Sequence, residues 1–543
     1  MSPNKFTNKW NNNNNNNTKI LSTGFGKIKG LKKENYNVFF SIPYATSKRF
    51  NIPFFIKPWK GIADCTKYKN DAFQEFDNGI EQNEDCLNLT IWTPKKNKKK
   101  LPVFVWIHGG GYAVNAPNQI ICDGKYLATK DMIVVAIKYR LNAFGFFATF
   151  KTKCQAVNDE DKKLYWKNKQ KCLATTKKNN EPIYTNGNWG INDQIKALQW
   201  IKKNIKYFKG DKNNITIAGE SAGSFSVSNL ICSPAALAKN QSDKKPLFHK
   251  AIMESGCLWN SENIEEKIKR CEEISKKMKN NTPQEYVNHT KMSWNMISKE
   301  QYNHNFFASL MPNYDEWIVA DNWKEKIEND NFNKVPILLG WNKNEGRLFG
   351  DDESGKGMKE EHAKFSYEYF VNDKISNLKE KDCYEKLKKM INENSLDKLS
   401  FRKENNSKPC QEVISLMFSY PMIWLANTIL EMKKVPIYVY NFCYEYFYPF
   451  SVPFSSAHTA EIPMVFNSLN FKTEEDKWMQ KNICENWVNF IKNGKPKEKK
   501  WKKYSIEKPF SLHFCNIKDG GIFYSYFWNY EYITSFIKNF PPK

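Results

Sequence analysis

The sequence of 543 residues lacks a long hydrophobic run. Its longest apolar stretches, Leu101 to Ile107 and Met132 to Ile137, are far shorter than the roughly 18 residues that a membrane-spanning helix needs. We therefore expect no integral membrane segment. The N-terminus, which includes seven asparagines at 11–17, also lacks the apolar stretch of about 7 to 15 residues found in a secretory signal. As written, the chain has no visible export signal and would be cytoplasmic, but the sequence leaves the compartment open.

Arginine is scarce. Only five of the 83 basic residues are arginine, although the formal charge is +25. Sequence-specific nucleic-acid contacts and bidentate phosphate contacts favour arginine. The lysines are spread along the chain among asparagine, isoleucine and aromatic residues, as is typical of solvated surface. We therefore predict no nucleic-acid partner.

Closely spaced metal ligands are also missing. The 13 cysteines include no CxxC pair and no Cys/His spacing typical of a zinc site. The sequence thus predicts neither a metal nor an organic cofactor. Because 13 is an odd number, at least one thiol stays free or pairs with another chain.

What the chain does contain is material for a large core. Hydrophobic residues make up 41% and aromatic residues 15% of it, which excludes a fibrous or wholly disordered protein. Short apolar runs alternate with amphipathic stretches, and this alternation predicts an α/β fold. The expected fold has a central, mostly parallel twisted sheet with helices on both faces and insertions. The expected strands are 101–107, 132–137, 215–218, 251–253 and 335–339, and a helix is expected over 193–205.

Two segments depart from this pattern. Residues 1–20 form a low-complexity Asn/Lys-rich tail, which we expect to be disordered. Residues 151–185 are dense in Lys, Asp and Asn and are predicted to be a surface insertion, with Cys154 and Cys172 available to link it internally. The remainder, 21–543, is predicted to be a single domain. No internal repeat is evident.

The sharpest local motif is GESAG at 219–223, directly after the expected strand 215–218. A nucleophile held at a tight strand-to-helix turn needs small neighbours two residues before and after it. This pattern makes Ser221 a candidate nucleophile. The alternative is an ordinary serine in a glycine-rich turn.

A serine nucleophile needs a base and an acid to orient that base. Of the seven histidines, His458 lies in a loop between apolar stretches, well after Ser221. Glu345 follows the strand 335–339 and lies between the two in sequence. The order Ser, acid, His is that of α/β-hydrolases. The alternatives are a solvated turn carboxylate for Glu345 and a buried core histidine for His458.

A second glycine-rich motif, HGGGY at 108–112, follows the strand 101–107. Backbone N–H groups aimed at a carbonyl oxygen stabilise the negative charge that develops there during acyl transfer. We predict that Gly110, Gly111 and Ala222 supply these groups. The alternative is a turn that is merely flexible.

Together, these motifs make the chain resemble the type-B carboxylesterase and cholinesterase family of α/β-hydrolases. The resemblance extends over almost the whole sequence. The further motifs that match are SIPYA (41–45), EDCLNLTIWTP (84–94), YRLNAFGFF (139–147), GNWGINDQIKALQW (187–200), FHKAIMESG (248–256), NKNEG around Glu345, AHTAEIPMVF around His458, and WVNFIKNGKP (487–496).

The resemblance implies roles for individual residues. Ser221 corresponds to the nucleophile, Glu345 to the acid and His458 to the base, with Gly110, Gly111 and Ala222 as the oxyanion donors.

It also implies structural pairings. Arg49 and Glu84 match the positions of a family salt bridge. Cys86 matches one half of a family disulfide, but the position of its usual partner is Ala72 here, and the nearest upstream cysteine is Cys65. Members of this family are usually exported, in contrast to the expectation from the N-terminus.

Substrate preference is limited by a missing tryptophan. Cholinesterases hold a quaternary ammonium group on a tryptophan before the EDC motif by cation–π attraction, and residues 65–84 contain none. The resemblance therefore favours a general carboxylesterase. Trp259 and Trp341 follow matched motifs and are candidates for the acyl pocket or, equally, for the core.

The sequence thus predicts a serine hydrolase that cleaves small-molecule carboxylic esters through an acyl-enzyme. The alternative is a catalytically silent relative that serves in adhesion or storage. The natural ester and the oligomeric state are left open.

Overall fold

The computed structural model describes residues 17–74, 79–96, 100–148, 187–257, 262–263, 267–268, 271, 311–315, 317–320, 322–350, 408–433, 435–447 and 453–526. The chain forms two compact units. The N-terminal unit comprises Ser2–Ala251 and Ser261–Val335, and the C-terminal unit comprises Ile252–Asn260 and Pro336–Lys543 together with Met1. The predicted insertion, 151–185, lies outside the described residues.

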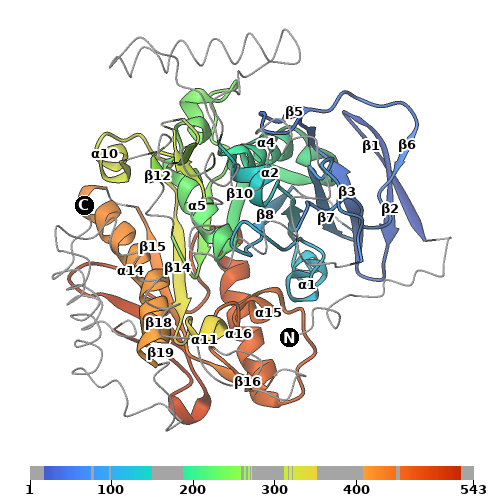
Figure 1. The fold of residues 1–543 in the computed structure, drawn as a ribbon. Helices are drawn as coiled ribbons and strands as arrows, with labels where there is room; N and C mark the ends of the chain where they lie inside the picture. Colours follow the sequence, from blue (N-terminus) through green and yellow to red (C-terminus); the bar gives the residue numbers. More distant parts are fainter. Residues whose placement is uncertain are drawn as a thin grey trace, which may run out of the picture. The chain divides into compact units, whose positions relative to one another are not determined.

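A mixed sheet forms the centre of the N-terminal unit (Figure 1). Its strand order is β1-β2-β3-β7-β9-β8-β10, and β6 pairs with β2. The strands β8, β9 and β10 pair parallel, whereas the pairs from β1 through β7 to β9 are antiparallel. The bounds are β1 (Thr18–Thr23), β2 (Gly26–Lys32), β3 (Tyr36–Pro43), β6 (Ile62–Asp64), β7 (Asn88–Pro94), β8 (Leu101–Ile107), β9 (Ile133–Ile137) and β10 (Gly210–Glu220).

Helices and short ladders complete this unit. Helix α5 packs against β8 and β10, and α1 packs against β7 and β9. In the described part of this unit the helices are α1 (Lys125–Ala128), α2 (Asn142–Phe146), α4 (Trp189–Asn204), α5 (Ala222–Cys232) and α10 (Trp323–Glu328). The short ladders pair β4 (Ala45–Thr46) with β5 (Phe54–Phe55) and β12 (Glu262–Asn263) with β13 (Asn313–Tyr314).

The C-terminal unit has its own series of strands, in the order β11-β14-β15-β18-β19. The pairs β14–β15 and β15–β18 are parallel, and β19 runs antiparallel to β18. The bounds are β11 (Lys250–Glu254, which contains the boundary between the units), β14 (Ile337–Asn342), β15 (Ile437–Phe442), β18 (Phe510–Phe514) and β19 (Ile522–Tyr526), with a separate ladder of β16 (Glu445–Phe447) and β17 (Pro453–Ser455).

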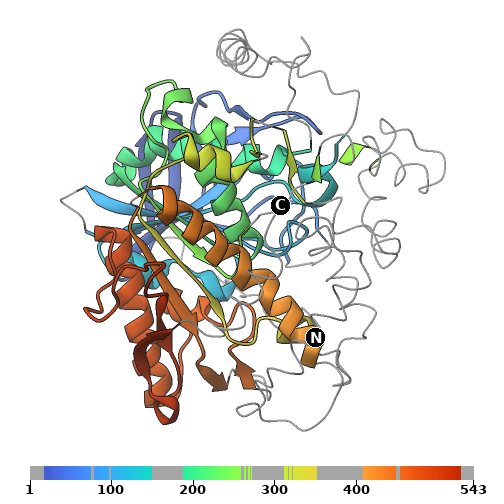
Figure 2. The same ribbon diagram turned by 90° about the vertical axis from the view of Figure 1, so that its left-hand side faces the viewer.

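Within the described residues, the helices of the C-terminal unit are α11 (Arg347–Gly350), α14 (Lys408–Met432), α15 (Ile462–Phe466) and α16 (Glu474–Asn493). The long helix α14, orange in Figure 2, contacts β14. Helix α16 begins where the Thr473 hydroxyl accepts the N–H of Asp476 at 3.0 Å, and ends at Gly494 with φ of 72°. Both are common features of helix ends. The hydroxyl accepts an N–H that has no partner within the helix, and the glycine adopts the left-handed conformation that ends the helix.

The predicted α/β class is confirmed. The apolar run 101–107 is strand β8, and the run 132–137 contains β9, whose five residues are all buried. Strands covered on both faces are expected to be continuously apolar, as these are. Helix α4 begins at Trp189, four residues before its predicted start, because Trp189 and Ile191 are themselves buried.

The predicted tail, 1–20, extends too far. Strand β1 begins at Thr18, where the chain pairs with Leu31 of β2 in antiparallel register. Backbone hydrogen bonds with β2 order these residues although their own sequence is polar. The single domain predicted for 21–543 stays a prediction.

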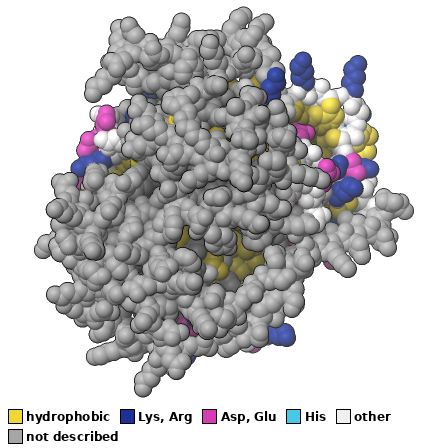
Figure 3. Space-filling view, in the orientation of Figure 1, with side chains coloured by type: hydrophobic (Ala, Val, Ile, Leu, Met, Phe, Trp, Pro, Cys, Tyr) yellow, Lys and Arg dark blue, Asp and Glu magenta, His cyan; other side chains and the backbone are white. Residues whose placement is uncertain are grey.

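Charged side chains are interspersed on the described surface. In Figure 3, lysine and arginine side chains at the right-hand margin lie among acidic and hydrophobic ones. Among the described residues, no helix combines the length and apolar character needed to cross a bilayer.

Candidate active site

Ser221 occupies the turn between β10 and α5. Its φ of 56° and ψ of −125° are unusual for a residue with a side chain, and it is half-buried at the N-cap of α5. The Ser221 carbonyl accepts the N–H of Phe225 at 2.9 Å, which starts the helix. This is the strained strand-to-helix turn predicted from the GESAG motif.

The flanking glycines are required by close backbone contacts. A Cβ on Gly219 would collide with the backbone of Gly223, and a Cβ on Gly223 would collide with the carbonyl oxygen of Ile107. The turn therefore packs directly on the end of β8. Any side chain at either glycine would displace backbone atoms.

The HGGG loop lies beside Ser221 because β8 and β10 are parallel neighbours that end at the same edge of the sheet. A Cβ built on Gly109 would lie 3.1 Å from the Ser221 Cβ. Gly110 and Gly111 have φ of 102° and 61°, which favour glycine. Ala222 is the first residue of α5, so its N–H has no acceptor within the helix.

His108, at the start of this loop, is a buried structural residue. Its ring stacks on Tyr139 at a centroid distance of 4.5 Å, and the Tyr139 hydroxyl donates to the His108 carbonyl at 2.8 Å. Burial lowers the pKa of His108 to about 4. A neutral ring fixed by stacking holds the backbone of the loop in place.

Glu345 and His458 are in direct contact within the C-terminal unit. The His458 Nδ1 lies 2.6 Å from the Glu345 Oε2, and their side chains are 3% and 0% exposed. Because a carboxylate only accepts, Nδ1 carries the proton in this bond. The other oxygen, Oε1, accepts the backbone N–H of Asn342 at 2.7 Å. The ring of Phe418 packs against the imidazole at 4.4 Å.

Two asparagines join the loops that carry this pair. The Asn342 side chain donates to the Ala457 carbonyl at 2.7 Å. The backbone N–H of Asn344 donates to the Ser456 carbonyl at 3.0 Å, and its side-chain amide donates to the Ser456 hydroxyl at 2.9 Å. Neither asparagine was predicted from the sequence, although both lie within the motif around Glu345.

A second buried carboxylate, Glu461, lies three residues after His458 and was also missed. It accepts hydrogen bonds from the Asn342 amide at 2.5 Å and the Ser255 hydroxyl at 3.3 Å. Burial, and then the charge of Glu345, raise the pKa of Glu461 to about 8. This shift favours the protonated form of Glu461. In the sequence, the apolar run 462–466 directly after Glu461 could have indicated that this glutamate is buried.

The structure thus assembles the predicted residues in two groups. Ser221, Ala222 and the HGGG loop lie together in the N-terminal unit, and Glu345 contacts His458 in the C-terminal unit. Burial lowers the pKa of His249 and of His513 to about 4. The histidines 289, 304 and 362 lie outside the described residues.

The structural pairings have separate outcomes. Arg49 Nη2 lies 2.5 Å from Glu84 Oε1, so the predicted salt bridge is confirmed. Cys65 and Cys86 are free, buried thiols, and burial raises the pKa of each to about 12. Cys154 and Cys172 lie outside the described residues.

Of the two tryptophans considered for the acyl pocket, only Trp341 lies within the described residues. Trp341 is a buried residue of β14, 3% exposed, as expected of a core residue. Trp259 lies outside the described residues. Among the described residues, one group of three potential metal ligands lies together, namely Cys443, His513 and Cys515, and it includes none of the candidate catalytic residues.

Comparison with known proteins identifies relatives along most of the chain. A model of the carboxylesterase family matches residues 17–157 and 179–519. Para-nitrobenzyl esterase of Bacillus subtilis (strain 168) is 27% identical over 507 residues, covering 88% of this chain and 90% of its own. Liver carboxylesterase 1F of Rattus norvegicus is 29% identical over 539 residues, which cover 88% of this chain and 86% of the relative. Acetylcholinesterase of Danio rerio, at 29% identity, covers 61% of this chain and 52% of its own.

Solved structures give the same fold. A thermophilic PNB esterase has a TM-score of 0.73 at 24% identity, covering 95% of this chain and 99% of its own. Another PNB esterase has a TM-score of 0.71 at 24% identity, covering 93% and 97%. The predicted α/β-hydrolase fold is confirmed.

Proposed function

The chain belongs to the carboxylesterase family, and we propose that it hydrolyses carboxylic esters with Ser221 as nucleophile, His458 as base and Glu345 as the acid that orients the base. The main support is the buried hydrogen bond between His458 Nδ1 and Glu345. The strained turn at Ser221 is the second support.

In the first step, Ser221 attacks the acyl carbon of the ester and His458 accepts its proton. Because Glu345 engages Nδ1, the nitrogen that takes this proton is Nε2. The carboxylate then faces an imidazolium ion and stabilises it in a buried environment. His458 next donates the proton to the departing alcohol.

The oxyanion of the tetrahedral intermediate is stabilised by the N–H groups of Gly110, Gly111 and Ala222. Each such donor contributes about 3 kcal/mol to the stability of the transition state. Support comes from the HGGG loop beside Ser221 and from the N-terminus of α5, whose partial positive charge favours an anion.

Water then repeats the cycle on the acyl-enzyme, again with His458 as base. Side chains and backbone N–H groups carry out every proton transfer and charge stabilisation in this scheme. It therefore requires no metal or organic cofactor.

The proposed substrates are small-molecule carboxylic esters. Acetylcholine is disfavoured, because residues 65–84 contain no tryptophan to bind a quaternary ammonium group. A general carboxylesterase also agrees with the names of the relatives that match over most of their length.

The test is hydrolysis of a p-nitrophenyl ester series from acetate to palmitate. We expect the wild-type protein to turn over and Ser221→Ala to lose on the order of 10⁴-fold or more in kcat. Ser228→Ala is the matched control, because this serine lies in helix α5, which Ser221 precedes, and its hydroxyl donates to the Phe225 carbonyl at 2.8 Å. The control should retain activity.

Covalent labelling by a fluorophosphonate gives an independent readout of the nucleophile. Wild type and Ser228→Ala should be labelled at Ser221, and Ser221→Ala should not. A folded wild-type protein that neither hydrolyses any ester nor reacts would refute the proposal and favour the silent adhesion or storage role.

A further inference from the structure

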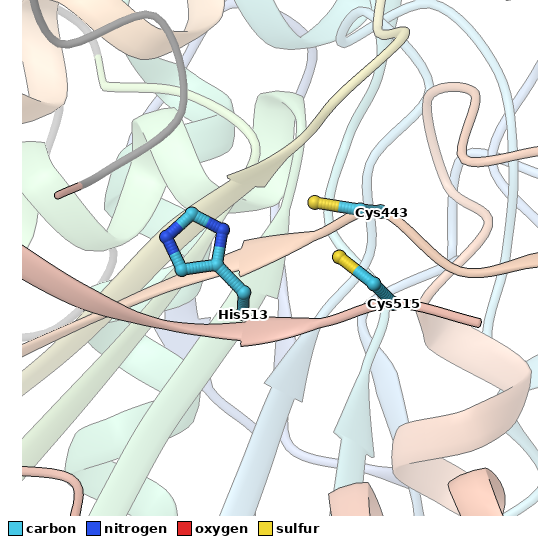
Figure 4. A group of neighbouring side chains, drawn as sticks. All are labelled: Cys443, His513 and Cys515. Atoms are coloured by element: carbon cyan, nitrogen blue, oxygen red, sulfur yellow. The ribbon is translucent and has the colours of Figure 1, made fainter. Parts of the chain in front are cut away.

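Three potential metal ligands meet at the ends of two strands of the C-terminal unit. Cys443 follows β15 directly, His513 is in β18, and Cys515 follows β18. Their ligand atoms all lie within 4.8 Å of one another (Figure 4). The three residues are 7%, 2% and 4% exposed, respectively.

The strand register explains this meeting. Strands β15 and β18 are parallel, and Phe442 pairs with Phe514. The next residue on each strand is a cysteine, and the Cys443 N–H donates to the Phe514 carbonyl at 2.8 Å. His513 is two residues before Cys515 and so faces the same side of the strand.

The hydrogen bonds of His513 leave one nitrogen suited to bind a metal. Its Nε2 lies 2.7 Å from the Tyr526 carbonyl, which can only accept, so Nε2 carries the proton. Nδ1 then has a lone pair, and this atom is buried without a hydrogen-bond partner. In Figure 4 the ring nitrogen nearer the main chain faces the two sulfur atoms.

This arrangement matches a known pattern at metal centres. A histidine ligand usually donates its second ring N–H to a carbonyl or carboxylate, which fixes the tautomer and the ring orientation. Stacking on Phe523 at 4.8 Å holds the ring in plane.

The two cysteines are free thiols. A bound metal ion displaces the thiol protons, because cysteine binds metals as the thiolate. Two thiolates and a neutral imidazole around a divalent cation have no net charge, which suits a buried site.

We propose that Cys443, His513 and Cys515 bind a zinc ion that links the ends of β15 and β18. Thiolate and imidazole are the ligands zinc prefers, and tetrahedral coordination with Zn–S near 2.3 Å places two sulfurs about 3.8 Å apart. The ligand atoms lie at most 4.8 Å apart in the structure, so the sulfur atoms must move by about 1 Å to reach this geometry. Rotation of the cysteine side chains can supply such a movement. Three protein ligands leave one position of the tetrahedron open. This site is independent of ester hydrolysis.

The experiment measures the zinc content of the full-length chain after purification under reducing conditions and removal of free metal. We expect close to one zinc per chain, and a loss of most of it in Cys443→Ser, Cys515→Ser and His513→Gln. Cys232→Ser is the matched control, because Cys232 is also a buried free thiol but lies outside the cluster. It should keep its zinc.

Cobalt provides a readout that needs no variant. Replacement of zinc by Co²⁺ in the wild-type chain should give thiolate-to-cobalt charge-transfer absorption and the intense visible bands of tetrahedral cobalt. His513→Cys, which preserves three ligands, should retain metal if His513→Gln fails to fold.

Three results would overturn the proposal. The first is a folded wild-type chain without zinc and without the cobalt spectrum. The second is zinc that persists when both cysteines are replaced. The third is a Cys443–Cys515 disulfide, found by peptide mapping in protein that takes up no metal under reducing conditions.

Discussion

Glu345 holds His458 by a buried hydrogen bond of 2.6 Å to Nδ1, and its second oxygen is held by the backbone N–H of Asn342. The carboxylate is therefore fixed at both oxygens. This leaves it little freedom to rotate away from the imidazole. Such preorganisation is what a base needs if its orientation is to survive repeated turnover.

We predict that Glu345→Gln lowers kcat on the order of 10⁴-fold while the protein stays folded. The glutamine amide can donate to Nδ1, which stabilises the tautomer that has its proton on the wrong nitrogen. The measurement is kcat on a p-nitrophenyl ester, with the exposed Glu507→Gln as control. A kcat within about twofold of wild type would contradict the role assigned to Glu345.

Gly223→Ala is expected to destabilise the protein by several kcal/mol, because its Cβ would collide with the Ile107 carbonyl oxygen, a backbone atom that cannot move alone. Gly61→Ala is the comparison. Gly61 has φ of 83° but open space around it, so only backbone strain of about 1 kcal/mol applies. The midpoint temperature of thermal unfolding should be clearly lower for Gly223→Ala than for Gly61→Ala. Equal midpoints would rule out the steric clash at Gly223.

Glu461 should make stability depend on pH. Its pKa rises from 4.5 in the unfolded chain to about 8 in the folded one. Between these values the folded state holds an extra proton, so its stabilising contribution is complete below 4.5 and is lost as the pH rises through 8. The slope is about 1.4 kcal/mol per pH unit.

Glu461→Gln should therefore flatten the fall in stability between pH 5 and 8, since glutamine resembles the protonated acid. The check is urea unfolding at several pH values for wild type, Glu461→Gln and the control Glu507→Gln. An unchanged slope in Glu461→Gln would show that Glu461 ionises normally in the folded protein.

Asp193→Ala is expected to lower the free energy of unfolding by about 3–5 kcal/mol. Asp193 accepts from Arg140 Nε at 2.8 Å and Nη2 at 2.7 Å, and both residues are buried. Removal of the carboxylate would leave a buried guanidinium without compensation. Urea midpoints should show the loss, whereas the exposed pair Lys477–Glu474 should contribute less than about 1 kcal/mol when Glu474 is replaced by alanine.

Local patterns in the sequence identified those strands and turns whose own residues are sufficient to predict them. The apolar run 101–107 is β8 over its full length, and the glycines of GESAG predicted the strained turn at Ser221. The run 215–218 predicted only the middle of β10 (Gly210–Glu220), whose start is set by pairing of Gly210 with Leu101. Pairing with a neighbouring strand is invisible in the local composition.

The sequence by itself determined the α/β class, the family resemblance and the residue types needed for acyl transfer, because apolar periodicity and glycine placement are local properties. Only the tertiary structure decided which side chains meet. Glu461 is 116 residues from Glu345 in sequence, and only folding brings it to Asn342, whose backbone N–H binds Glu345 and whose side-chain amide binds Glu461. Likewise, Cys443 and Cys515 show no metal-binding spacing in sequence, yet the parallel register of two strands places their thiols side by side.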